Sequence, residues 1–371
     1  MIYFDNAATT FPKPDCVYDA VNEGMKNFAF NAGRGSYNAA TNTFKMITDT
    51  REKVANIIKA NPNQVVFTSS ATESLNMIIN GLDLKKGDKV YVSPFEHNSI
   101  VRTLYKCGVD IRLIPFNKND WSVDYSKFND ELAINKPKAV IISHISNVTG
   151  YELPYNEIFK YSKKYKAVTV LDSAQGFGIY PVDSKYVDLL VFAGHKSLYS
   201  VFGIAGFINI SEIFLDTYKT GGTGSDSLNL SMPQDFPSRM EAGSLNSVAI
   251  YALNKSIDFV INSNFAIKKH ELTSYLISKL RELDNVIIYC PENIETKGIV
   301  AFNIEGYTSD EAGKILSSKY DICVRTGYHC APYIHDFIND KEYAGCIRVS
   351  LSGFNTIEEI NALIYAIREM S

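Results

Sequence analysis

Short apolar runs alternate with longer amphipathic stretches between Gln64 and Ile210. The runs are rich in β-branched residues and have the length of buried strands, whereas the segments between them have the length of helices. The runs predicted as strands are Val65–Thr68, Lys89–Ser93, Ile111–Phe116, Ala139–Ser146, Val168–Asp172, Leu189–Ala193 and Gly203–Ile210. This alternation predicts a doubly wound, mainly parallel α/β sheet, with ligands at the carboxyl ends of its strands.

The pattern changes after about residue 250. Tyr251–Leu283 is predicted as one long helix, and the rest of the chain mixes strands with helices. The further predicted elements are strands at Val286–Tyr289, Gly298–Ile304 and Ile347–Leu351, and a helix at Ile357–Met370. We therefore expect a large ligand-binding α/β domain over 13–250 and a small α+β domain over 251–371, with residues 1–12 packing on the small domain.

Composition narrows the functional classes. The 371 residues suit two domains, and a hydrophobic fraction of 46% is typical of globular proteins. A net charge of −4 gives no electrostatic support to a nucleic-acid partner. No apolar stretch suits a membrane span, and the first ten residues do not resemble a secretory signal. Six cysteines without a CxxC pair predict free thiols in a reducing cytoplasm, and no Cys or His spacing predicts a metal site.

Two charged residues stand at the ends of neighbouring predicted strands. Lys196 follows Leu189–Ala193, and Asp172 ends Val168–Asp172. Lys196 could form a Schiff base with an aldehyde cofactor, and Asp172 could keep a pyridine nitrogen protonated. Taken separately, Lys196 is typical of a solvated loop and Asp172 equally of a helix N-cap. Their separation fits one strand-to-strand connection, which would bring the two side chains together.

The hydroxyl-rich segment Thr68–Ser74 lies between a predicted strand and a predicted helix. Small residues at a helix N-terminus offer backbone N–H groups and a favourable dipole to a phosphate. A plain capping segment is the stronger interpretation when this segment is taken alone.

The segment Arg325–Pro332 (RTGYHCAP) contains Cys330. A cysteine is nucleophilic as its thiolate, and a nearby cation lowers the pKa of a thiol. Arg325 and His329 could each supply that cation. The alternative is a structural thiol, which suits the other cysteines: Cys16, Cys107, Cys290, Cys323 and Cys346.

Arg348 interrupts the apolar strand Ile347–Leu351. A buried arginine is costly unless it is paired. A bidentate clamp on a substrate carboxylate would account for Arg348, and a structural salt bridge would do so equally well.

In their order along the chain, these segments resemble the class V (fold type I) family of enzymes dependent on pyridoxal phosphate (PLP). Within it, they resemble the cysteine desulfurases and selenocysteine lyases. The matching segments are Tyr3–Thr10, Asn31–Gly35, Ser70–Thr72, Glu96–Ser99, Ser146–Gly150, Asp172–Gln175, Gly194–Lys196, Arg239–Ser244, Arg325–Pro332 and Arg348. Each segment is a weak signal alone, whereas the ordered set is specific and spans almost the whole chain.

The resemblance implies roles for individual residues. Lys196 would hold PLP, and Asp172 would contact the ring nitrogen of PLP. His97 would lie over the ring and assist proton transfer. Further cofactor contacts would come from Ala71, Thr72, His195, Asn147, Gln175 and, across a homodimer interface, Ser244. The substrate would be bound by Arg348, Asn147 and Arg325, next to Cys330 on a short, ordered loop as in group II desulfurases.

The implied activity is cysteine desulfuration, in which L-cysteine becomes L-alanine and Cys330 carries the sulfur as a persulfide. A protein acceptor and a role in iron–sulfur cluster assembly would follow. The alternatives are a selenocysteine lyase, another class V reaction (transamination or β-elimination) in which Cys330 is incidental, and an inactive binding protein.

The sequence departs from the family pattern in four places. Ser70 replaces a usual glycine, Ala193 a usual hydroxyl residue, and Ser200-Val201 a common Gly-Pro. These changes put cofactor affinity in question. Tyr328 replaces a frequent histidine, so His329 is expected as the cation nearest Cys330 in the sequence.

Overall fold

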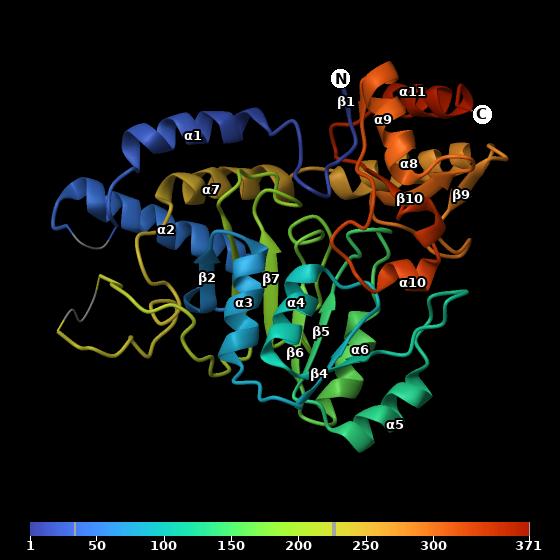
Figure 1. Cartoon of the computed structure of the whole chain (residues 1–371). Helices are drawn as coiled ribbons and strands as arrows, with labels where there is room; N and C mark the ends of the chain where they lie inside the picture. Colours follow the sequence, from blue (N-terminus) through green and yellow to red (C-terminus); the bar gives the residue numbers. More distant parts are fainter. Residues whose placement is uncertain (33–34, 225–227, 371) are drawn as a thin grey trace.

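The computed structural model describes residues 1–32, 35–224 and 228–370 (Figure 1). Gly33 and Arg34, part of the Asn31–Gly35 segment of the family resemblance, lie outside these described residues. A large sheet flanked by helices forms one part of the molecule, and a smaller unit of strands and helices lies beside it (Figure 1). None of the described helices combines the length and the apolar character needed to cross a bilayer.

The large sheet has seven strands in the order β2-β8-β7-β6-β5-β3-β4. All neighbouring pairs are parallel except those of β8, which runs antiparallel to both β2 and β7. The strands are β2 (Val65–Thr68), β3 (Lys89–Val92), β4 (Asp110–Leu113), β5 (Ala139–Ser143), β6 (Val168–Asp172), β7 (Leu189–Ala193) and β8 (Ala205–Asn209). The predicted α/β fold class is therefore confirmed, and each strand lies where its apolar run predicted it.

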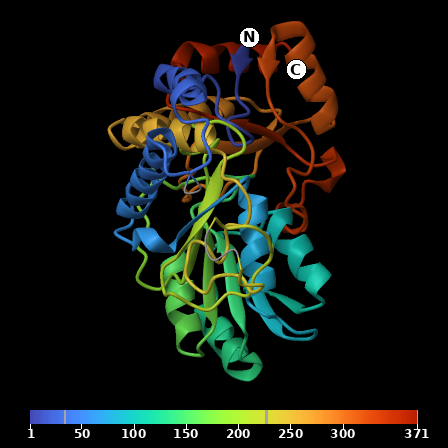
Figure 2. The ribbon, with the colours of Figure 1, turned by 90° about the vertical axis from the view of Figure 1, so that its left-hand side faces the viewer.

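Helices cover both faces of this sheet (Figure 2). One face packs against α3 (Ala71–Gly81) and α4 (Asn98–Cys107). The opposite face packs against a second group of helices, namely α1 (Asp15–Asn27), α2 (Asn38–Asn56), α5 (Tyr125–Asn135), α6 (Tyr155–Lys163) and α7 (Ser247–Ile261). Successive strand residues enter the two clusters alternately, as the two-residue repeat of a strand requires.

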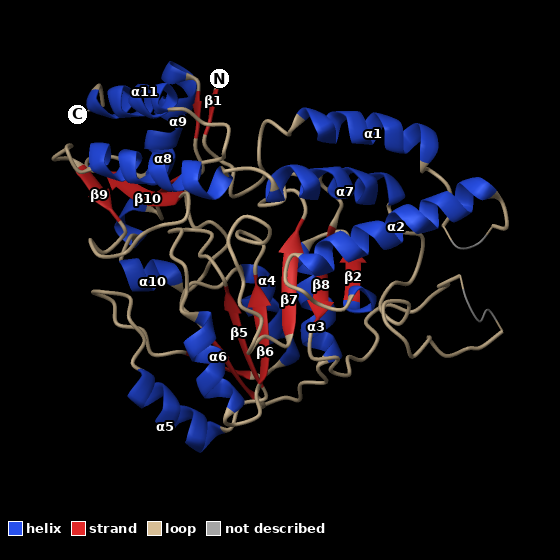
Figure 3. Ribbon diagram, turned by 180° about the vertical axis from the view of Figure 1, so that it is seen from behind, coloured by secondary structure: helices blue, strands red, loops and turns tan. Residues whose placement is uncertain are grey.

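The smaller unit contains an antiparallel sheet of order β12-β10-β9. The segments are β9 (Val286–Ile288), β10 (Ile299–Ile304), β12 (Ile347–Ser350), α8 (Phe265–Leu280), α9 (Ser309–Tyr320), α10 (Ile334–Ile338) and α11 (Ile357–Arg368). The N-terminal strand β1 (Ile2–Tyr3) pairs with β11 (Ile322–Cys323) and lies beside this unit (Figure 3). Phe4 is buried in the same cluster as α8, α9 and α11. The domain division at residue 250 stays a prediction.

The expectation of one helix over Tyr251–Leu283 is wrong, because α7 and α8 are separate helices. The break falls at Asn262-Ser263-Asn264, whose short polar side chains compete for backbone hydrogen bonds. The Asn262 amide donates to the Asp258 carbonyl at 2.7 Å, and the Ser263 hydroxyl donates to the Val260 carbonyl at 2.7 Å. These bonds end α7 and leave α8 free to turn toward the smaller sheet.

Candidate active site

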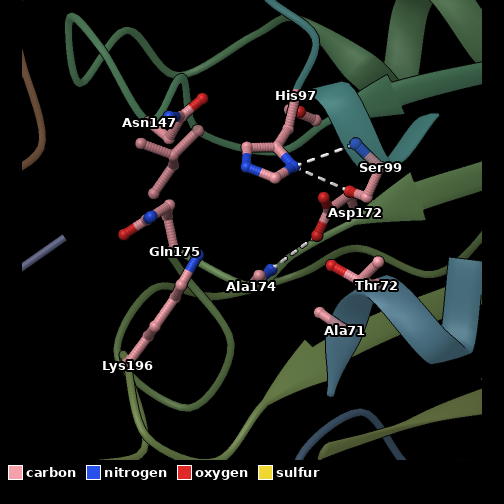
Figure 4. A pocket seen from close by; sticks show the side chains of 11 residues that line it. Ala71, Thr72, His97, Ser99, Asn147, Asp172, Ala174, Gln175 and Lys196 are labelled. Carbon is pink, nitrogen blue, oxygen red and sulfur yellow. Dashed lines mark hydrogen bonds between the residues drawn. The ribbon is translucent and has the colours of Figure 1, made fainter. Parts of the chain in front are cut away.

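A pocket opens at the carboxyl ends of β5, β6 and β7, where the start of α3 and the loop before α4 also meet (Figure 4). Seven of the residues predicted from the sequence line it: Ala71, Thr72, His97, Asn147, Asp172, Gln175 and Lys196. Ser99, Ser143, Ile145 and Ala174 complete the lining. The fold therefore brings together residues that are spread over more than a hundred positions of sequence.

Lys196 projects into this pocket from the loop after β7. Gly194 shapes the loop, because a Cβ there would lie 2.6 Å from the Ile204 carbonyl oxygen. Burial lowers the pKa of the Lys196 amine; Asp172 opposes this shift, and the positive charges of Arg348 and Arg325 add to it. A larger share of the amine is therefore neutral and nucleophilic than in an exposed lysine.

Asp172 is 8% exposed at the end of β6. Its Oδ1 accepts a hydrogen bond from the Ala174 N–H at 3.0 Å, while Oδ2 has no hydrogen-bond partner among the described residues. Burial raises the pKa of this carboxyl, whereas the hydrogen bond from Ala174 and the charge of Lys196 act to lower it. The alternative of a helix N-cap does not apply, because no helix begins there. One carboxylate oxygen thus has room for a donor in the pocket.

His97 caps α4 and presents its ring to the pocket (Figure 4). Its Nδ1 accepts from the Ser99 N–H at 3.1 Å and lies 2.8 Å from the Ser99 hydroxyl. Burial lowers the pKa of His97 to about 3, with Lys196 and other cations adding to the effect. The imidazole is therefore neutral at neutral pH and suited to accept a proton.

Glu96 lies behind the pocket wall and is fully buried. Its Oε1 accepts from the Ser143 N–H at 3.0 Å and from the Ser93 hydroxyl, and its Oε2 accepts from the Ser143 hydroxyl at 2.8 Å. Burial raises the pKa of Glu96 to about 7. Glu96 belongs to the family segment Glu96–Ser99, but no role was assigned to it from the sequence. The sequence feature that could have indicated a role is a carboxylate directly before His97.

Cys330 is exposed on the loop between β11 and α10. The Arg325 guanidinium lies 3.7 Å from its sulfur, and the Asn98 N–H donates to the Cys330 carbonyl at 2.7 Å. Both His329 and Cys330 have positive φ angles, 45° and 58°, which are unusual for residues with a Cβ. The loop is therefore held in a defined and strained conformation. Cys330 also contributes to the electrostatic field at Lys196.

The expectation that His329 is the cation next to Cys330 is wrong. His329 is 3% exposed, and its Nε2 bonds to the Cys346 carbonyl at 2.9 Å. Burial, with Arg348, holds the pKa of His329 well below its ordinary value, so the ring is neutral. Among the described residues, the Arg325 guanidinium is the positive charge that contacts the sulfur.

Arg348 is 1% exposed on β12. Its Nη2 pairs with Asp5 Oδ1 at 2.6 Å, and its Nη1 donates to the Asn147 carbonyl at 2.8 Å. Arg348 therefore forms the structural salt bridge that was one of the two interpretations of the sequence. Its partner Asp5 was missed because the two residues lie 343 positions apart in the chain. Backbone hydrogen bonds of 2.8 and 3.3 Å between Arg325 and Arg348 connect this ion pair to the Cys330 segment.

Two predicted cofactor residues do not line this pocket. The His195 ring stacks on Phe202 with centroids 4.6 Å apart, and its carbonyl accepts from the Lys13 ammonium at 3.1 Å. Ser244 lines a separate hollow of about 300 Å³ together with Glu73 and Lys219. The roles expected for His195 and Ser244 stay predictions.

Comparisons with known proteins agree with the motif order. The family description "Aminotransferase class-V" matches residues 2–363, and the chain belongs to this family. A probable cysteine desulfurase of Methanothermobacter thermautotrophicus is 32% identical over 100% of this chain and 94% of its own length. A cysteine desulfurase of Shigella sonnei is 30% identical over 100% and 93%.

Solved structures support the same grouping. The apo structure of a cysteine desulfurase from Thermococcus onnurineus NA1 superposes with a TM-score of 0.90 at 28% identity. The alignment covers 100% of this chain and 94% of the other. The resemblance to the class V cysteine desulfurases, drawn from the sequence motifs, is confirmed.

Proposed function

We propose that this chain is a PLP-dependent cysteine desulfurase that converts L-cysteine to L-alanine and holds the released sulfur as a persulfide on Cys330. The observation that carries the proposal is the exposed Cys330 sulfur beside the Arg325 guanidinium. Its loop also connects through Arg325 to Arg348 and to the Asn147 wall of the Lys196 pocket. A nucleophilic sulfur and a nucleophilic amine thus flank one site.

The pocket residues fit PLP by the chemistry of their donors. The N-terminus of α3 at Ala71 and Thr72 offers a phosphate N–H groups that have no acceptor in the described part of the chain. The Ser70 side chain caps Glu73 at 3.1 Å, so its replacement of glycine is compatible with a helix start. Asp172 Oδ2 suits a protonated ring nitrogen, and the Lys196 amine suits an aldehyde. When bound, PLP would supply an electron sink for the substrate α-carbon.

The chain's own residues would bind and orient the substrate. Arg348 would hold the carboxylate of cysteine, with the pairing to Asp5 keeping the guanidinium in place. Lys196 Nζ would accept the α-proton, because burial favours its neutral form. The Cys330 thiolate would attack the substrate sulfur, so that an S–S bond forms as the substrate C–S bond breaks. The electron pair of that bond stays on the β-carbon, which takes up a proton, and Lys196 would return the α-proton, so that alanine is formed.

The remaining parts of the proposal concern assembly and context. We place Ser244 at the phosphate of a neighbouring subunit in a homodimer, since it lies outside its own chain's pocket. The persulfide would pass to a protein acceptor in iron–sulfur cluster assembly, within the cytoplasm. Gln175, whose amide donates to the Ala7 carbonyl at 2.9 Å, and Asn147 would contact the cofactor ring oxygen or the substrate.

The test is a single turnover with L-cysteine in the absence of reductant, followed by peptide mass spectrometry. The Cys330 peptide should gain the mass of one sulfur atom, and the Cys323 peptide should not. A parallel reaction with selenocysteine separates sulfur from selenium preference. Alanine formation without sulfur on Cys330 would contradict the proposal.

A further inference from the structure

Lys269, on α8, is a mostly buried lysine. It is 8% exposed, and its ammonium makes no hydrogen bond or ion pair within residues 1–32, 35–224 and 228–370. Burial lowers the pKa of Lys269 to about 8. A mostly buried ammonium is costly unless an opposite charge pairs with it, and no carboxylate of the described residues forms an ion pair with Lys269.

The surrounding backbone makes room for this side chain. Gly298, with φ of 75°, lies where a Cβ would be 2.3 Å from Cε and 3.0 Å from Nζ of Lys269. The ammonium then lies 5.6 Å from the Tyr180 ring centroid, and the Lys297 ammonium lies 5.7 Å from the same ring. Lys297 also pairs with the carboxylates of Glu152 at 3.3 Å and Glu295 at 3.2 Å. Lys269 has no such ion pair among the described residues, and one aromatic ring compensates only part of its charge.

Lys269 lines a small cavity that it shares with Lys196. The cavity has a volume of about 10 Å³, room for about one water-sized species. Asn6, Thr10 and Ser197 add polar groups, and the lining contains two lysines and no acidic residue. A cavity of this size is too small for a carboxylate or a phosphate group, and the Lys269 ammonium on its wall favours a small anion.

We propose that this cavity binds one halide-sized monovalent anion against Lys269. Chloride has the required charge and size, and so does hydrosulfide. The hydrosulfide alternative rests on the proposed function, because reduction of a Cys330 persulfide by a thiol releases sulfur in that form. Because Lys196 lines both this cavity and the active-site pocket, an anion here would act on the Lys196 amine as well.

Bromide is the probe, measured by its NMR line width in the presence of the purified protein with its cofactor. The buffer keeps ionic strength constant with gluconate, which is too large for the cavity. The parent protein should give saturable broadening at pH 7, and chloride should reverse it. Lys269→Met should lose the saturable part, and Lys268→Met, one position away on the same helix, should keep it.

The broadening should also fall as pH rises through about 8, because the anion needs the charged form of Lys269. The other titratable groups near this region are Tyr180, Tyr199, Lys196 and Lys297, together with Glu152 and Glu295, which pair with Lys297. Both carboxylates keep their charge near pH 8, so they do not cause a change in this range. Adding hydrosulfide to borohydride-treated protein with bromide, and following the bromide line width, tests whether hydrosulfide also binds in the cavity.

Thermal melting supplies a second readout that does not depend on activity. Bromide should raise the melting temperature of the parent and of Lys268→Met, and leave that of Lys269→Met unchanged. Gly298→Ala should lose the bromide effect too, since its methyl group displaces the Lys269 side chain. Equal bromide effects in the parent and in Lys269→Met, or no bromide effect in the parent, would overturn the proposal. Neither result bears on whether Cys330 accepts sulfur.

Discussion

The two sides of the candidate site are built in different ways. On one side, Lys196 and Asp172 stand at the ends of the adjacent parallel strands β7 and β6. On the other side, Cys330, Arg325 and the pair of Arg348 with Asp5 come from distant segments joined by side-chain and backbone bonds. The first side follows from sheet topology, whereas the second depends on contacts that only the complete fold creates.

The largest expected effect falls on the sheet side. Lys196→Ala should lower the rate of alanine release by about 10³-fold or more, because the amine that binds the aldehyde and moves the α-proton is gone. Borohydride reduction and peptide mapping should label Lys196 in the parent and leave the variant unlabelled. Lys185→Ala, at an exposed turn, is the control and should be labelled at Lys196 as the parent is. A label on another lysine of the parent would contradict the assignment.

The next prediction tests the contact-built side. Arg348→Lys should raise KM for L-cysteine by about 10- to 100-fold, since an ammonium cannot form the fork of bonds that a guanidinium forms. The rate constant kcat should change much less, because the altered contact is to the substrate carboxylate. Steady-state kinetics on L-cysteine give both values.

Asp5→Asn tests the ion pair of Arg348 separately from the contact of Arg348 with the substrate. It should lower the free energy of unfolding by about 1–3 kcal/mol, because Arg348 is then buried beside a neutral partner. Urea denaturation measures this change, with Asp15→Asn as the control at an exposed helix start.

An unchanged KM in Arg348→Lys would mean that Arg348 serves only the ion pair with Asp5.

Glu96, behind the sheet side, is expected to affect the pH dependence of stability. Burial raises its pKa from about 4.5 to about 7, so the folded chain binds a proton that the unfolded chain has already released in this range. Stability should therefore fall by up to about 3 kcal/mol between pH 5 and 7 and then level off. Urea denaturation at several pH values should show this fall in the parent.

Glu96→Gln is the matched variant, because its amide stays neutral and keeps the size of the side chain. The fall in stability between pH 5 and 7 should be smaller in Glu96→Gln than in the parent. The same pH dependence in both proteins would show that other groups cause it.

The sequence predicted most of the sheet side. Strands β6 and β7 were placed to the residue, because each is a short, mainly apolar run, and their ends located Asp172 and Lys196. The contact-built side was predicted only in part. Cys330, Arg325 and Arg348 were found and Asp5 was missed. The burial that makes His329 neutral and the pairing of Arg348 with Asp5 depend on tertiary packing. No local pattern encodes these two features.

The helix break at Asn262-Ser263-Asn264 shows a different limit. The apolar period continues through both α7 and α8, so periodicity alone predicts one helix. The break depends on two side-chain bonds to the carbonyls of Asp258 and Val260. Short polar residues are a signal for such bonds, although the same residues also occur inside helices.

The central claim is that the Cys330 thiolate takes the sulfur, and the rate of alanine release by Cys330→Ser tests it most directly. The variant should still bind the cofactor and cysteine, because neither step uses the thiol. Alanine release from L-cysteine should fall by about 100-fold or more, since a hydroxyl cannot replace a thiolate as the nucleophile. Cys323→Ser should release alanine at nearly the parent rate. Alanine release by Cys330→Ser at the parent rate would contradict the account and show that the thiol is not the sulfur acceptor.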